Sequence, residues 1–108
     1  MKLKNKIALI TGSSSGIGQG VAKLFAQEGA TVVVNYPNQE EAENANTTLE
    51  LIAGVSPHSI THMANVSAEN EVIEMVNNVK DEFGTIDILV NNAGIATSAP
   101  IHEMTSKM

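Results

Sequence analysis

The sequence predicts an α/β protein in which a parallel β-sheet carries helices on both faces. Short apolar segments rich in β-branched residues alternate with longer segments whose apolar residues recur at helical spacing. A glycine-rich segment directly follows the first apolar segment and leads into a helical pattern. Strands that alternate with helices pair in parallel through helical crossovers, so we expect an open sheet covered on its two sides.

Four strands and three helices are expected in order along the chain. The expected strands are residues 7–10, 30–34, 59–64 and 86–90. The first helix starts after the glycine-rich segment and ends at Gly29. Asn38, with Glu41 three residues later, is the expected N-cap of the second helix, and Ser67 is that of the third, which ends at Gly84.

Each helix is expected to bury one apolar stripe against the sheet. The stripes are Ile17, Val21, Leu24 and Phe25 in the first helix, Ala42, Ala45, Leu49 and Ile52 in the second, and Val72, Val76, Val79 and Phe83 in the third.

Length and composition narrow the class of protein further. The chain has 108 residues, which limits it to one domain, and 43% of its residues are hydrophobic.

The formal net charge of −6 and the absence of a basic cluster argue against nucleic acid as a partner. No cysteine is present, and the three histidines have no metal-ligand spacing, so no metal site is expected. No signal-like or membrane-length apolar run occurs, so we expect a cytoplasmic protein that does not associate with membranes.

The segment from Thr11 to Gly18 carries most of the functional information. It reads Thr-Gly-Ser-Ser-Ser-Gly-Ile-Gly between an apolar strand and an amphipathic helix. A helix N-terminus has unpaired N–H groups and a positive dipole end, and glycines let an anion approach the backbone closely. A flexible glycine-serine linker is the alternative interpretation, but its position between strand and helix disfavours it. A P-loop is excluded, because no Gly-Lys-Ser/Thr follows.

Three motifs in order extend this interpretation to nearly the whole chain. They are the Thr11–Gly18 segment, Asn65-Val66 after the third strand, and Asn91-Asn92-Ala93-Gly94 after the fourth. With this spacing, the chain resembles the short-chain dehydrogenase/reductase family of NAD(P)-dependent oxidoreductases. Within that family it looks most similar to 3-oxoacyl-acyl-carrier-protein reductases and bacterial glucose dehydrogenases. The resemblance implies a Rossmann-type fold and hydride transfer between nicotinamide and a carbonyl or alcohol substrate.

The resemblance assigns cofactor contacts to residues in all three motifs. The residues expected around the pyrophosphate are Gly12, Ser13, Ser14, Gly16, Ile17 and Gly18. Asn65 stands where the family usually has Asp, and its amide oxygen can still accept from the adenine amino group, while Val66 packs on the adenine ring. Asn91 is expected near the adenosine ribose, and Ala93 and Gly94 close to the cofactor. For Asn91 and Asn92, simple turn chemistry at a strand end is the alternative.

The end of the second strand bears on the choice of cofactor. NAD-binding proteins generally place an acid there for the ribose 2′-hydroxyl, but this chain has Asn35 and Tyr36, with no carboxylate before Glu40. Ser13, Asn35 and Asn38 are candidate neutral hydrogen-bonding groups for a 2′-phosphate. The sequence therefore favours NADP, with NAD as the alternative, and Asn35 and Tyr36 join the expected cofactor site.

No catalytic residue is assigned. Catalysis in the family depends on a serine, a Tyr-x-x-x-Lys pair and an asparagine on elements beyond the fourth strand. The sole tyrosine here is Tyr36, and Glu40 stands four positions later. We therefore expect residues 1–108 to be the N-terminal part of a single NAD(P)-binding Rossmann domain, truncated after the fourth strand. The whole enzyme is expected to act on a small molecule and, by resemblance, to form a homo-oligomer. A non-catalytic dinucleotide-binding or interaction module of this length is the alternative.

Overall fold

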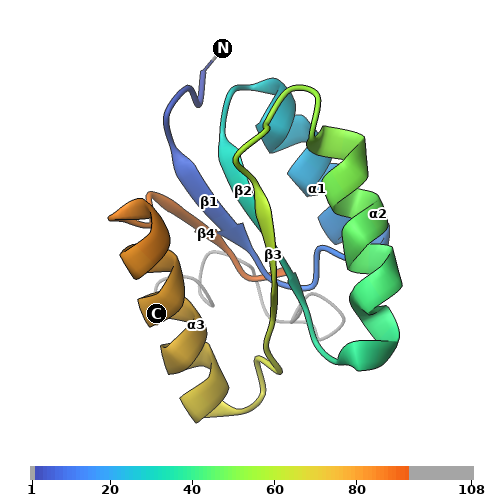
Figure 1. Ribbon diagram of the computed structural model, residues 1–108, viewed down its shortest axis with the longest axis vertical. Helices are drawn as coiled ribbons and strands as arrows, with labels where there is room; N and C mark the ends of the chain where they lie inside the picture. The colour runs from blue at the N-terminus through green and yellow to red at the C-terminus, as the bar shows by residue number, and fades with distance from the viewer. Residues whose placement is uncertain (1, 93–108) are drawn as a thin grey trace.

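A computed structural model of the protein describes residues 2–92 (Figure 1). Its elements are β1 (Ile7–Ile10), α1 (Gly16–Gln27), β2 (Thr31–Tyr36), the 3-10 helix η1 (Gln39–Glu41), α2 (Ala42–Ile52), β3 (Ile60–Met63), α3 (Glu69–Phe83) and β4 (Ile88–Val90).

The four strands form one parallel sheet in the order β3-β2-β1-β4. In register, Leu9 of β1 lies opposite Val33 of β2 on one side and opposite Leu89 of β4 on the other. Helices α1 and α2 cover one face of the sheet, and α3 covers the opposite face (Figure 1). The expected fold class, a parallel sheet with helices on both faces, is confirmed.

The side chains of β1 and β2 contribute to two separate hydrophobic cores, because successive side chains of a strand point to opposite faces of the sheet. Ala8, Ile10, Val32 and Val34 belong to the core beneath α1 and α2. Leu9 and Val33 belong to the core beneath α3, together with Met75 and Val79 of that helix. These strand residues are fully buried, as a strand covered on both faces requires.

The stripe expected for α1 is partly wrong. The residues of α1 that are buried are Gly18, Ala22 and Ala26, whereas Ile17 and Leu24 are 66% and 56% exposed. Val21 and Phe25 are partly buried against the core. Small side chains face the sheet because they let the helix axis come close to it, and of the large apolar residues only Val21 and Phe25 pack against the core.

The expected helix ends are confirmed in part. Asn38 is the N-cap of η1, the 3-10 helix directly ahead of α2, and its side chain accepts a hydrogen bond from the Glu41 N–H; the N-cap of α2 itself is Glu41. Gly84 ends α3 with a φ of 84°, a left-handed conformation that favours glycine. Ser67 as N-cap of α3 is wrong: the helix begins at Glu69 after Ala68, and Ser67 hydrogen-bonds to Asn65 instead.

Candidate functional site

The expected site residues gather at one edge of the sheet, because the carboxyl ends of parallel strands meet there. Thr11–Gly18 follow β1, Asn35 and Tyr36 end β2, Asn65 and Val66 follow β3, and Asn91 follows β4. Ala93 and Gly94 lie outside the described residues. In open α/β sheets this edge is where ligands bind.

The glycine-rich segment is a tight turn held by hydrogen bonds from both neighbouring strands. On the β4 side, the Thr11 N–H donates to the Val90 carbonyl (3.0 Å) and Asn92 Nδ2 donates to the Gly12 carbonyl (3.0 Å). Toward β2, the Gly12 N–H donates to Asn35 Oδ1 (3.0 Å). Hydrogen bonds within the protein therefore define the shape of the turn.

Two glycines of the turn have different physical roles. Gly18 faces the turn: an added Cβ would collide with the Gly12 carbonyl oxygen and lie 2.5 Å from Asn92 Nδ2. Gly16 has a φ of 60°, and an added Cβ would meet no atom within 4 Å. Gly18 thus lets α1 pack on the turn, whereas Gly16 faces open space at the start of the helix.

The N-terminus of α1 has no cap from within the described residues. Ser15, the N-cap residue, makes no side-chain capping bond, and the first turn holds no acidic residue. The N–H groups of Gly16, Ile17 and Gly18 have no acceptor in the part of the chain that the structure describes. Together with the positive end of the helix dipole, these donors make an environment that suits an anion.

Asn35 has a different role from the one expected. It was expected to offer a neutral hydrogen bond to the cofactor, but it is only 1% exposed. Besides accepting from Gly12, its side chain donates to the carbonyls of His62 (3.2 Å) and Ala64 (3.1 Å). Its side chain therefore joins the glycine turn to the end of β3 rather than facing a ligand.

The serine hydroxyls of the turn are also engaged internally. Ser13 is fully buried, donates to the Ile10 carbonyl (2.7 Å) and accepts from the Asn35 N–H (3.1 Å). Ser14 donates to Glu41 Oε1 (3.1 Å). These hydroxyls position the turn, which leaves backbone N–H groups and the exposed Ser15 as its outward donors.

After β3, Asn65 and Val66 form a short turn ahead of α3. Asn65 Oδ1, the atom expected to accept from adenine, accepts from both the N–H (3.0 Å) and the hydroxyl (2.6 Å) of Ser67. The Asn65 N–H donates to the Glu71 carboxylate (2.8 Å). Val66 is partly buried against the α3 core. The Asn65 oxygen is thus already occupied.

Asn91 and Asn92 connect the end of β4 to the glycine turn. The Thr11 hydroxyl donates to Asn91 Oδ1 (3.2 Å), and Asn92 bonds the Gly12 carbonyl as described above. Sequence reasoning assigned Asn91 to the site but missed Asn92, Ser15 and Glu41. Asn92 could have been found from its place in the Asn91-Asn92-Ala93-Gly94 motif. No local sequence pattern indicates that Glu41 lies beside the turn.

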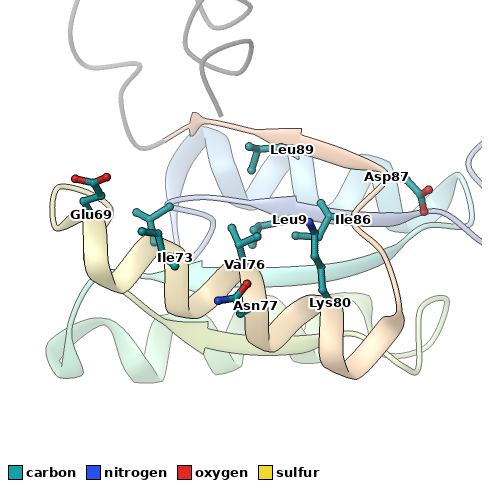
Figure 2. Close-up of a pocket in the computed structure, with 10 residues that line it drawn as sticks. Leu9, Glu69, Ile73, Val76, Asn77, Lys80, Ile86, Asp87 and Leu89 are labelled. Atoms are coloured by element: carbon teal, nitrogen blue, oxygen red, sulfur yellow. The ribbon is translucent and has the colours of Figure 1, made fainter.

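A separate groove of about 590 Å³ lies on the face of the sheet that α3 covers, between α3 and β4 (Figure 2). Its apolar lining includes Leu9, Ile73, Val76, Ile86 and Leu89. It contains none of the expected site residues. Within residues 2–92 there is no cluster of His, Asp or Glu suited to a metal ion, and no helix long and apolar enough to span a membrane.

The sheet order and the glycine turn at the N-terminus of α1 define a Rossmann-type α/β fold. A family profile described as short chain dehydrogenase matches residues 6–108, and the chain belongs to this family.

Individual relatives agree with this assignment. The chain is 44% identical over 91 residues to a 3-oxoacyl-[acyl-carrier-protein] reductase, FabG, of Staphylococcus epidermidis, covering 84% of this chain and 36% of the relative. It is 39% identical over 105 residues to the short-chain dehydrogenase/reductase homolog YusS of Bacillus subtilis, covering 96% of this chain and 94% of that protein. Several curated relatives are thus more than twice as long as this chain, which spans 36–42% of their length.

Solved structures show the same fold. The structure of a short chain dehydrogenase from Burkholderia cenocepacia in complex with NADP matches with a TM-score of 0.78 and 36% identity. The match covers 84% of this chain and 36% of that one.

Proposed function

We propose that residues 1–108 are the N-terminal, cofactor-binding part of an NAD(P)-dependent oxidoreductase that moves hydride between nicotinamide and a carbonyl or alcohol carbon. Two findings support this proposal. The chain belongs to the short-chain dehydrogenase family, and it spans less than half the length of several relatives. The observation that carries it is the start of α1, where three backbone N–H groups with no acceptor among residues 2–92 lie beside the open space at Gly16.

The residues present fit a dinucleotide. The amides of Gly16, Ile17 and Gly18 would hold the pyrophosphate, while Gly12, Ser13 and Ser14 shape the turn around it. Val66 would pack on adenine, and Asn65 would lie beside the ring with its side-chain oxygen bonded to Ser67. The nicotinamide, when bound, supplies or accepts hydride. Asn91, Ala93 and Gly94 complete the proposed site after β4, and no catalytic residue is assigned within these 108 residues.

The cofactor proposal keeps the preference expected from the sequence, NADP, with NAD as the alternative. The absence of an acid at Asn35 and Tyr36 supports it, and the related Burkholderia protein is in complex with NADP. The substrate is a small molecule with a carbonyl or alcohol group. A homo-oligomer and a cytoplasmic location remain predictions from the family and the sequence.

Substituting Gly16 tests the proposal. Gly16→Ala places a methyl group in the open space where the pyrophosphate would lie, so NADPH binding, measured by fluorescence titration, should weaken at least about tenfold. Gly84→Ala is a matched control, because Gly84 also has a positive φ and open surroundings but lies at the end of α3. Equal NADPH dissociation constants for the two variants would reject the proposed site.

A second candidate is a non-catalytic dinucleotide-binding or interaction module. It is favoured by one observation, that this chain spans 94% of the B. subtilis homolog YusS. The reading frame beyond codon 108 discriminates the two. A downstream serine and Tyr-x-x-x-Lys pair would support the oxidoreductase, whereas a stop codon together with NADPH binding would support the module.

A further inference from the structure

We propose that Glu41 is a specificity residue of the cofactor site and disfavours the 2′-phosphate of NADP. This inference rests on the proposed function, since it assigns a role at the same site. Glu41 lies beyond Asn35 and Tyr36 at the end of β2, and η1 brings it back to the glycine turn.

The Glu41 carboxylate is fixed in place against the turn. Its Oε1 accepts from the Ser14 hydroxyl (3.1 Å) and from Asn44 Nδ2 (3.3 Å). The backbone of Glu41 is held by Asn38, whose side chain accepts from the Glu41 N–H (3.3 Å). Ser14 is itself 3% exposed, so this contact has little freedom to shift. Both hydrogen-bond partners of the carboxylate are neutral side chains, so neither offsets its negative charge.

The path of the cofactor brings the adenosine ribose near this charge. The pyrophosphate belongs at the start of α1, after β1, and adenine belongs at Asn65 and Val66, after β3. Because β2 lies between β1 and β3, the ribose must cross the end of β2. Glu41 follows that strand and contacts Ser14 of the turn, so its carboxylate lies beside this crossing.

A carboxylate at this place has opposite effects on the two cofactors. It accepts a hydrogen bond from a ribose hydroxyl, which NAD retains, and it repels a 2′-phosphate. Asn35 and Tyr36 offer no such repulsion. Glu41 therefore reduces the preference for NADP that the end of β2 alone would give.

The two adjacent glutamates provide a matched test. Glu41→Gln removes the charge but keeps an oxygen that accepts from Ser14 and Asn44. Glu40→Gln removes the same charge from an exposed position of the same 3-10 helix. Dissociation constants of NADPH and NADH are measured for the intact protein and both variants by fluorescence titration at low and at physiological ionic strength.

We expect Glu41→Gln to raise the affinity for NADPH relative to NADH by about tenfold, with a smaller effect at the higher ionic strength. Glu40→Gln should change this ratio much less, because Glu40 is exposed and, among the described residues, no hydrogen bond joins its side chain to the turn. An unchanged ratio in Glu41→Gln, or equal changes in both variants, would overturn the role of Glu41 while leaving the proposed function intact. Failure of the unsubstituted protein to bind either cofactor would overturn both proposals.

Discussion

The Asn35 side-chain oxygen accepts a hydrogen bond from the Gly12 N–H at 3.0 Å, and this bond joins the end of β2 to the turn that follows β1. Two further hydrogen bonds reinforce it, since the Ser13 N–H donates to the Asn35 carbonyl and the Asn35 N–H donates to the Ser13 hydroxyl. The amide nitrogen of Asn35 reaches onward to the carbonyls after and within β3. One buried side chain thus sets the relative positions of three strand ends that form the candidate site.

Replacing Asn35 by alanine should therefore destabilise the protein and weaken cofactor binding together. The Gly12 N–H and the Ala64 carbonyl would lose their partner in a buried place, which we expect to lower the free energy of unfolding by about 3 kcal/mol. Urea denaturation measures this change. Asn38→Ala, at the exposed N-cap of η1, is the control and should cost about 1 kcal/mol. Similar losses in the two variants would show that Asn35 has no special role in holding the turn.

The close approach of α1 to the turn leads to a second prediction. Gly18→Ala puts a Cβ against the Gly12 carbonyl and Asn92, and neither backbone nor amide can move without breaking the turn, so stability should fall by about 2 kcal/mol. Gly20→Ala, two residues further along α1, meets open space and should raise stability by about 0.5–1 kcal/mol through its helix propensity. Thermal unfolding of both variants compares them directly. A stabilised Gly18→Ala variant would contradict the packing described here.

The glycine motif suggests that a larger side chain at Gly18 would block the approach of a pyrophosphate. The direction of an added Cβ at Gly18 points to a different cause for any loss of cofactor binding. Its Cβ instead points into the contact between α1 and the turn, while Gly16 faces the open side. The motif indicates which residues are glycine. Only the direction in which an added Cβ would point shows which atoms a larger side chain would collide with at each position.

The sequence predicted the sheet well because Val32, Val33 and Val34 carry a strong local signal for a buried strand. Prediction from the sequence was wrong where contacts between residues far apart in the chain determine which side chains are buried. The exposed Ile17 looks like a core residue by helical spacing, and the buried Met75 of α3 was missed. The sequence indicated Glu41 only as part of a capping pattern, because its contact with Ser14 spans 27 residues and no local pattern encodes such a contact.

The groove beside β4 supports the last prediction, which concerns residues 1–108 expressed alone. Among the described residues, β4 pairs only with β1, and its three residues are half-buried. The groove between β4 and α3 exposes apolar side chains, including Ile73, which is 53% exposed (Figure 2). An open strand edge beside apolar surface is a template for association. We therefore expect this polypeptide to self-associate and to show no dehydrogenase activity, as measured by sedimentation velocity and a cofactor-linked assay.

A charge placed in the groove should suppress this association. Ile73→Lys introduces a cation on the apolar lining without emptying a buried position, so the fraction of monomer should rise severalfold with little change in melting temperature. Leu51→Lys is the matched control, because Leu51 is 52% exposed on α2, on the opposite face of the sheet. If both substitutions restore the monomer equally, general surface charge rather than the groove controls association. If unsubstituted residues 1–108 form a monodisperse monomer that melts cooperatively and binds NADPH, the association prediction is wrong and the self-sufficient binding module gains support.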